Sequence, residues 1–221
     1  VFNISAILFF LLLTNQQNAN EILIYADEIT YDQQSNIIAK GKAKVLYDNN
    51  FISSDLIIYS QKSGNITLPV EFNLKDKRNN YYFGSSGFFE SSFDFGNIKD
   101  VKILLEDGSR IVGNEIKRQG DIDIISKGVY TPCNSKIKIA NFLCPIWQIE
   151  SEKILHDYET LFLYQKHSKM RVFNLPVFYS PYLLTPSPLR KDRKSGFLTP
   201  SINLNFFDTK ISQSTSFPYY F

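Results

Sequence analysis

The sequence has little of what most catalytic and metal sites require. Its 221 residues include two cysteines, two histidines, one methionine and one tryptophan. A structural zinc site usually needs four ligands, and only His156 lies near the two cysteines, so we expect no metal and no other cofactor. The chain also lacks a Gly-x-Ser-x-Gly nucleophile turn and a glycine loop that ends in lysine, so we expect no enzymatic activity.

A large excess of charge of either sign is missing as well. The chain has 24 Lys and Arg residues against 22 Asp and Glu residues, which leaves a formal net charge of +2. Binding along a nucleic-acid backbone usually needs a concentrated basic face. The only basic block, at residues 190–194, is too short for that, so we expect no nucleic-acid partner.

Charge is absent altogether from residues 1–20, where Ile4–Leu13 form an almost unbroken apolar run. Ten helical residues span about 15 Å, half of the hydrocarbon core of a bilayer, so the run is too short for a transmembrane helix. Its length suits the apolar region of a signal peptide, with Ala19 near the cleavage zone. We therefore predict a signal peptide over 1–20 and export of the chain. The alternative is a buried strand or helix of the mature fold.

What the sequence does contain favours β structure. Aromatic residues make up 15% of the chain, and isoleucine is frequent. Apolar and polar residues alternate from Ile66 to Leu74 and from Val101 to Leu105, a spacing that sends each set to one face of a strand. No helical period stands out, so we predict an all-β fold of many short antiparallel strands, with Pro69 at an edge or a bulge. The side chains predicted to face inward are Ile66, Leu68, Val70, Phe72, Val101, Ile103 and Leu105.

An internal repeat begins after the apolar segment. Residues 26–37 (Ala-Asp-Glu-Ile-Thr-Tyr, then Asn-Ile) are echoed by residues 54–66 (Ser-Asp-Leu-Ile-Ile-Tyr, then Asn-Ile) at an offset of 28 to 29 residues. Each unit is predicted to be a strand, a polar turn and a second strand. Such a unit cannot bury its own apolar face, so we expect the units to stack on one another.

A proline-rich segment, 176–200, holds five of the nine prolines of the chain. Each proline fixes φ and removes a backbone donor, so we expect a stiff, extended connector that packs against apolar surface. The connector residues are Pro176, Pro181, Pro186, Pro188, Gly196 and Pro200. Gly196 and Pro200 follow the basic block, and a new strand is predicted from Ser201.

The ordered prolines, the sequence 193–200 (Arg-Lys-Ser-Gly-Phe-Leu-Thr-Pro) and the repeat at 26–43 together resemble the LptD family of lipopolysaccharide-assembly proteins, also called organic solvent tolerance proteins. The resemblance implies an open, V-shaped β-jelly-roll of the OstA type over 21–175 in the periplasm. It also implies a connector over 176–200 and the first strands of an outer-membrane β-barrel over 201–221. We expect the chain to be an N-terminal fragment of such a protein.

Two further stretches carry the same resemblance: Tyr130-Thr131-Pro132-Cys133, and Cys144-Pro145 followed by Ile-Trp. In an exported protein the two cysteines are expected to be oxidised rather than metal-bound. They could pair with each other, which would stabilise the fold by about 3 kcal/mol. In relatives of the family, disulfides tie the periplasmic domain to the barrel, so the partners could also lie beyond residue 221. Both pairings stay open.

The resemblance implies transport of lipopolysaccharide to the outer membrane of a Gram-negative bacterium, through a groove lined by the inward residues. The bridge protein LptA would add a strand at the edge formed by Ile22, Leu23, Ile24 and Tyr25. The plug lipoprotein LptE would sit in the barrel. Lipid phosphates would meet the basic residues Arg190, Lys191, Arg193 and Lys194.

Two alternatives keep the β fold. One is a free periplasmic bridge protein of the LptA type, although such a protein needs neither the Cys-Pro-x-Trp stretch nor the connector. The other is a glycan-binding or adhesin β-sandwich, or a glycosidase. That class predicts paired carboxylates in a cleft and aromatic platforms, and the chain has one tryptophan.

Overall fold

The structure is a computed structural model. It describes residues 22–132, 138–139, 142–143, 145–190, 196–197, 201–207, 210–216 and 219–220. Within these ranges every regular element is a β-strand, which confirms the predicted all-β fold. The predicted signal peptide and both cysteines, Cys133 and Cys144, lie outside the described residues.

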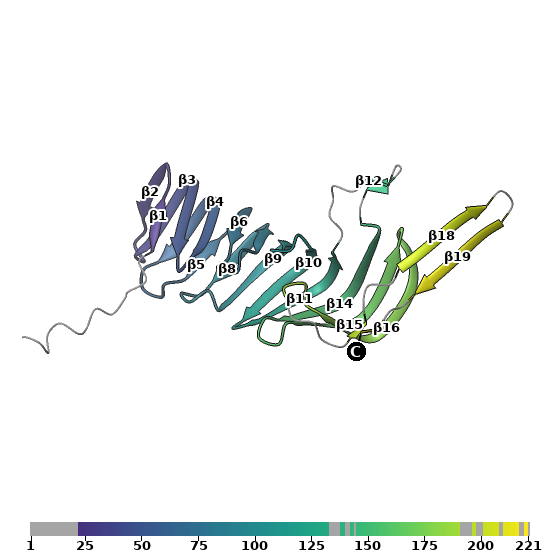
Figure 1. Cartoon of the computed structure of the whole chain (residues 1–221). Coiled ribbons are helices and arrows are strands. Elements are labelled where there is room, and N and C mark those ends of the chain that lie inside the picture. Colours follow the sequence, from purple (N-terminus) through teal and green to yellow (C-terminus); the bar gives the residue numbers. More distant parts are fainter. Residues whose placement is uncertain are drawn as a thin grey trace, which may run out of the picture.

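Most strands join one antiparallel sheet of 14 strands, stacked in chain order along one long axis (Figure 1). These strands are β1 (Leu23–Tyr25), β2 (Glu28–Tyr31), β3 (Asn36–Tyr47), β4 (Asn50–Ser60), β5 (Ile66–Leu68), β6 (Phe72–Lys75), β7 (Tyr81–Gly84), β8 (Ser86–Phe89), β9 (Phe95–Leu104), β10 (Arg110–Gln119), β11 (Ile122–Thr131), β14 (Trp147–Asp157), β15 (Phe162–Val172) and β16 (Leu175–Pro186).

Three small sheets complete the described elements. Their strands are β12 (Lys138–Ile139) with β13 (Phe142–Leu143), β17 (Gly196–Phe197) with β20 (Tyr219–Tyr220), and β18 (Ser201–Phe207) with β19 (Lys210–Ser216). A strand therefore begins at Ser201 as predicted. That this strand opens a barrel stays a prediction.

The long strands bend near their middle. Lys42, Asp100, Lys127 and His167 lie inside β3, β9, β11 and β15 with φ between 45° and 50°. A left-handed residue inside a strand interrupts the ladder and turns the chain, as the register shift between Lys40 and Ala43 shows. Because neighbouring strands bend at facing positions, the bends form one line across the sheet, which we call the crease.

The crease divides the sheet into two walls. Wall A contains β1, β6, β7 and the halves of the long strands that pair with them, and wall B contains β2, β5, β8 and the other halves. In β4, for example, Phe51–Ser54 pair with β6, whereas Ile58 and Tyr59 pair with β5. The stacked and creased strands confirm the predicted open β-jelly-roll architecture.

The internal repeat corresponds to neighbouring hairpins of wall B. The first unit is β2, its turn and the start of β3, and the second is the end of β4, its turn and β5. The two turns touch, since the Gln61 amide donates to the Ser35 carbonyl at 3.3 Å. The predicted stacking of the repeated units is therefore confirmed.

The alternating run from Ile66 to Leu74 is two strands and not one. β5 pairs in wall B, β6 pairs in wall A, and Pro69, Val70 and Glu71 lie between them at the crease. Pro69 thus stands where no ladder hydrogen bond is needed. The break also turns Val70 out of the alternation, and its side chain is 38% exposed instead of facing inward.

The first part of the proline-rich segment lies inside the sheet. Pro176, Pro181 and Pro186 belong to β16, which pairs with β15 on one side and with no other strand of the sheet among the described residues. An edge strand tolerates proline because one of its sides needs no donors. The expected apolar packing is not seen there, since Val177, Phe178 and Tyr182 are at least half exposed.

Candidate functional site

The two walls enclose an apolar interior. Six of the seven residues predicted to face inward meet in it, and each is at most 3% exposed. They come from both walls, for example Ile66 from wall B and Ile103 from wall A. The six are Ile66, Leu68, Phe72, Val101, Ile103 and Leu105. The interior at these positions is filled by the protein's own side chains, so a ligand can enter only if the walls separate.

Glycines of wall A allow the walls to meet closely beside the crease. A Cβ atom added to Gly84 would lie 2.3 Å from a methyl group of Ile98, and one added to Gly113 would lie 2.3 Å from a methyl group of Ile125. Ile98 and Ile125 belong to wall B. The interior is therefore narrowest at the crease, and its width there is set by residues without side chains.

The side of the interior opposite the crease, where the turns of the two walls face each other, is called the mouth. Phe93 leaves the turn after β8 with a φ of 60° and is buried. Its ring stacks on Phe89 of wall B and on Tyr47 at the end of β3 in wall A, with centroid separations of 5.3 and 5.8 Å. This aromatic contact closes the mouth near β3 and β4.

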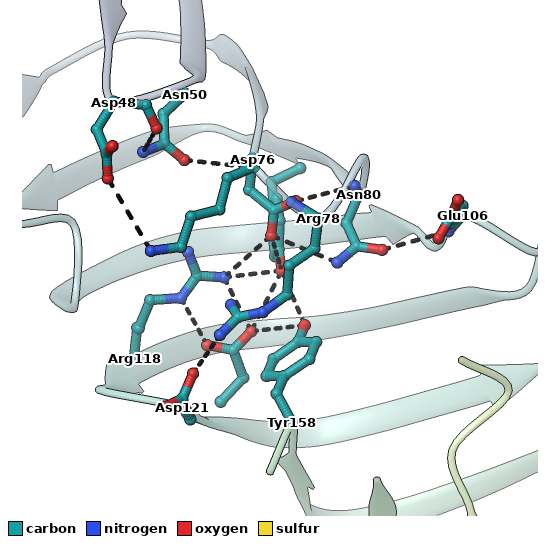
Figure 2. A network of polar contacts seen from close by, with 12 residues as sticks. Asp48, Asn50, Asp76, Arg78, Asn80, Glu106, Arg118, Asp121 and Tyr158 are labelled. Atoms are coloured by element: carbon teal, nitrogen blue, oxygen red, sulfur yellow. Dashed lines mark hydrogen bonds and ion pairs between the residues drawn. The ribbon is translucent and has the colours of Figure 1, made fainter. Parts of the chain in front are cut away.

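A group of polar side chains, called the bridging network, closes the mouth further along (Figure 2). Arg118 of wall B forms two bonds to Asp123, at 2.9 and 3.0 Å, and donates to the Tyr82 hydroxyl of wall A at 2.7 Å. The Tyr82 hydroxyl also lies 2.9 Å from that of Tyr158. The members are Asp76, Arg78 and Tyr82 of wall A and Arg118, Asp121, Asp123 and Tyr158 of wall B.

The charges of the bridging network are buried but compensated. Burial alone would raise the pKa of Asp123, but the ion pair with Arg118 outweighs it and holds the pKa of that carboxyl below its usual range. Burial raises the pKa of Tyr82 and of Tyr158, so both hydroxyls stay protonated and can donate. The network therefore holds a buried salt bridge and two neutral phenols at neutral pH.

Sequence reasoning missed the bridging network, although one signal was present. Arg118 and Asp123 face each other across the β10–β11 turn. Each occupies an inward position, two residues from Ile116 and Ile125 respectively, where an apolar residue is expected. Two opposite charges at paired inward positions predict an interior salt bridge.

Polar side chains join the apolar interior beyond the bridging network. The Ser151 hydroxyl of β14 lies 3.0 Å from Gln165 and 3.0 Å from Ser168 of β15, and all three side chains are buried. Gln165 also donates to Thr185 of β16 at 3.0 Å. These polar side chains thus bond to one another beside the buried apolar residues Ile154 and Leu163 of the same strands.

His156 lies inside the protein, whereas His167 is exposed. The His156 ring lies 2.9 Å from the hydroxyl of Ser187, which belongs to the turn after β16. Burial lowers the pKa of His156 to about 4, so the ring is neutral at pH 7.

This pKa predicts a specific loss of stability in mild acid. The unfolded chain gains a proton at His156 near pH 6.5 and the folded chain only near pH 4, so stability falls as the pH drops through this window. Between pH 7 and pH 5 this residue should lower the free energy of unfolding by about 2 kcal/mol. Urea unfolding at both pH values checks this, with His156→Gln as the control. An equal pH dependence in that variant would contradict the assignment.

Three of the four residues predicted to form the edge strand lie in β1, and Ile22 lies just before it. Leu23 and Tyr25 have exposed side chains, whereas Ile22 and Ile24 pack against the core. β1 pairs only with β3, so within the described residues its other side carries no strand.

Most of the basic block lies outside the described residues, namely Lys191, Arg193 and Lys194, and so does Pro200. The guanidinium of Arg190 packs over the Phe162 ring at 4.1 Å and donates to the Thr160 carbonyl. Pro188 lies in the turn after β16, and Gly196 begins β17. Of the four residues predicted to face phosphate, only Arg190 lies among the described residues, so their grouping stays a prediction.

In the described part of the chain, no three His, Cys, Asp or Glu side chains could hold a metal ion together, and no helix could span a membrane. A hollow of about 660 Å³ lies beside the crease. Its lining mixes lysines with carboxylates, such as Lys42 and Lys102 with Asp55 and Asp100, and so favours no charge of ligand.

Comparison with known proteins gives no matching family model. The LPS-assembly protein LptD of Haemophilus ducreyi is 32% identical over 110 residues, which cover 48% of this chain and 13% of that protein. LptD of Neisseria meningitidis serogroup B is 23% identical over 198 residues, covering 90% of this chain and 23% of that protein. LptD of Legionella pneumophila is 36% identical over 88 residues, covering 39% of this chain and 9% of that protein.

Among solved structures, that of LptH, the LptA homologous periplasmic component of the lipopolysaccharide transport device from Pseudomonas aeruginosa, aligns with a TM-score of 0.39 and 18% identity. The alignment covers 44% of this chain and 75% of LptH. The chain spans less than a quarter of the length of each of the LptD proteins described above. The chain is a sequence relative of the LPS-assembly protein LptD, which confirms the resemblance predicted from its repeat and its proline-rich segment.

Proposed function

We propose that the chain takes part in lipopolysaccharide transport and holds the acyl chains of the lipid between its two walls. The observation that carries the proposal is the apolar interior, which runs through the stacked strands from β3 to β15 and includes six of the residues predicted to line a groove. The similarity to LptD proteins supports the choice of lipid. The lipid is carried without chemical change.

The physical reason is the cost of exposing acyl chains to water. Each methylene group kept from water contributes about 0.8 kcal/mol, so a lipid with several acyl chains needs an apolar path across an aqueous compartment. The interior is closed in the free chain. When the walls separate, the apolar side chains of each wall lose their contacts with the other wall and gain contacts with the acyl chains. The total apolar contact is therefore largely kept.

The two ends of the sheet suggest the partners. The free side of β1 fits strand addition by a periplasmic bridge protein such as LptA, since main-chain groups on an unpaired edge bind an incoming strand. At the other end, the exposed apolar side chains of β16 fit contact with a barrel in the outer membrane, where LptE would be the plug. The sheet would then lie in the periplasm, and Cys133 and Cys144 would be oxidised.

A photo-crosslinking experiment tests the proposal. A diazirine side chain of leucine size at Ile103, which faces inward, should form an adduct with lipopolysaccharide. The same side chain at Lys102 or Val112, which are exposed on the outer face of wall A, should give at least ten-fold less. Equal adducts from inner and outer positions would rule out the interior as the lipid site.

A further inference from the structure

The bridging network ties the two walls together across the mouth through polar contacts (Figure 2). The β6–β7 turn and β7 of wall A supply Asp76, Arg78 and Tyr82. The opposing contacts come from wall B, where Arg78 pairs with Asp121 and the Tyr82 hydroxyl lies 2.9 Å from that of Tyr158. While these contacts persist, the walls cannot separate at this point.

The bridging network also stands where buried polar side chains begin to join the apolar residues of the interior. On one side lies the apolar interior of β3 to β9, which includes Ile103. On the other side Ser151, Gln165 and Ser168 hydrogen-bond to one another between β14 and β15. A hydrocarbon chain offers no hydrogen bonds, so passing it through the closed network would leave buried polar groups without partners.

The two buried carboxylates of the network have their closest partners in their own wall, and one longer ion pair, from Arg118 to Asp76 at 3.9 Å, crosses between the walls. The salt bridge of Arg118 with Asp123 lies wholly in wall B, on β10 and β11. Asp76 keeps partners in wall A, since it accepts from the amides of Arg78 and Asn80, both at 2.9 Å. Separation of the walls would therefore break the bonds of Tyr82 and Arg78 to wall B and the longer ion pair of Asp76 with Arg118. Asp123 would keep Arg118, and Asp76 would keep its two amide donors.

The contact nearest to water is the one that would open first. Arg78 and Asp121 have side chains that are 26% and 64% exposed, so water can replace each partner at low cost. Tyr82 lies behind them and is fully buried. Opening can thus begin at the outer ion pair and proceed inward to the tyrosines.

We propose that the bridging network is a gate that must open between the walls before acyl chains pass from the β3–β9 part of the interior to β14–β16. This inference rests on the proposed function, because it assumes that acyl chains enter the interior at all. It assigns to Arg78, Asp121, Tyr82 and Tyr158 the contacts that open.

A reversible lock tests the gate. In a chain with Cys133→Ser and Cys144→Ser, the changes Arg78→Cys and Asp121→Cys allow the walls to be joined by a bis-methanethiosulfonate crosslinker, which thiols remove. Diazirine side chains report lipopolysaccharide on either side of the gate, at Ile103 before it or at the buried Leu163 of β15 beyond it.

With the lock closed, the yield of the adduct from Ile103 should stay within two-fold of the yield before crosslinking. The yield of the adduct from Leu163 should fall at least ten-fold and return when thiols remove the crosslinker. The matched control joins Lys77→Cys to Asp48→Cys, an ion pair in neighbouring turns of wall A, and should change neither adduct. A Leu163 adduct unaffected by the closed lock would overturn the gate alone. No Ile103 adduct in the open chain would overturn the proposed function, and the gate with it.

A second measurement does not depend on the lock. Spin labels at Lys77 in wall A and Glu159 in wall B, both in turns at the mouth, report the separation of the walls. Adding lipopolysaccharide to the chain should lengthen the distance between the labels. An unchanged distance alongside a clear Leu163 adduct would contradict opening at this point.

Discussion

Replacing Arg118 with methionine is expected to lower the free energy of unfolding by about 3 to 5 kcal/mol, because Asp123 would keep a buried charge without its cation. Asp123 is 1% exposed, and Arg118 supplies both of its ion-pair bonds. Methionine fills a similar volume, so the loss reflects charge and hydrogen bonding rather than a cavity. Urea unfolding at pH 7, followed by circular dichroism, measures the change.

Two controls separate this effect from a general loss of charge. Arg171→Met removes an ion pair with Glu150 in which both side chains are about 30% exposed, and it should cost less than about 1 kcal/mol. Combining Arg118→Met with Asp123→Leu removes both members of the closest ion pair and should recover part of the stability. The buried Asp76, which lies 3.9 Å from Arg118, still loses that partner. If Arg118→Met alone cost less than about 1 kcal/mol, the buried salt bridge would not have the role described here.

Gly113→Val is expected to lower the free energy of unfolding by about 2 to 3 kcal/mol, the cost of overpacking a filled interior. The new Cβ would lie 2.3 Å from a methyl group of Ile125 and 3.1 Å from the Ser126 carbonyl oxygen. Because these atoms belong to the opposite wall, relief of the clash requires the walls to move apart at the crease. The same unfolding experiment measures the loss.

The neighbouring substitution Asn114→Val is the control for strand propensity. Asn114 is exposed in the same strand, so valine there should change the free energy of unfolding by less than about 0.5 kcal/mol. A tolerated Gly113→Val, with a loss no larger than that of Asn114→Val, would mean that the walls are not packed together at the crease.

Much of the fold could be predicted from local sequence pattern. Alternation placed Ile103 and Leu105 in the interior, because it depends only on the two-residue period of a strand. The repeat at 26–37 and 54–66 predicted stacked hairpins, because one such unit cannot bury its own apolar face. The prolines of 176–186 excluded a helix and a central strand, and β16 is an edge strand.

The crease could not be read in the same way. Left-handed residues such as Lys42, Asp100 and His167 are not glycines, and nothing local marks them as the bends of their strands. The break at Pro69 and Val70 follows from that long-range geometry, which is why Val70 was placed on the wrong face. The position of a bend depends on packing against the opposite wall, and the residue pattern of a single strand does not contain that information.

The bridging network was missed for a related reason. Tyr82 and Asp123 lie 41 residues apart, yet their hydroxyl and carboxylate oxygens are 3.3 Å apart. Arg118 or Asp123 considered alone is a charged strand residue, and its position in the sequence predicts no contact with the opposite wall. These residues form one group only because the two walls lie opposite each other in the folded chain.

An experimental structure of the chain with bound lipopolysaccharide tests most directly whether acyl chains bind between the two walls. The account predicts acyl chains between the walls, in contact with Ile103 and Leu105, and a larger separation of wall A from wall B than in the free chain. Acyl chains bound on the outer face of either wall, with the interior still filled by side chains as it is here, would contradict it.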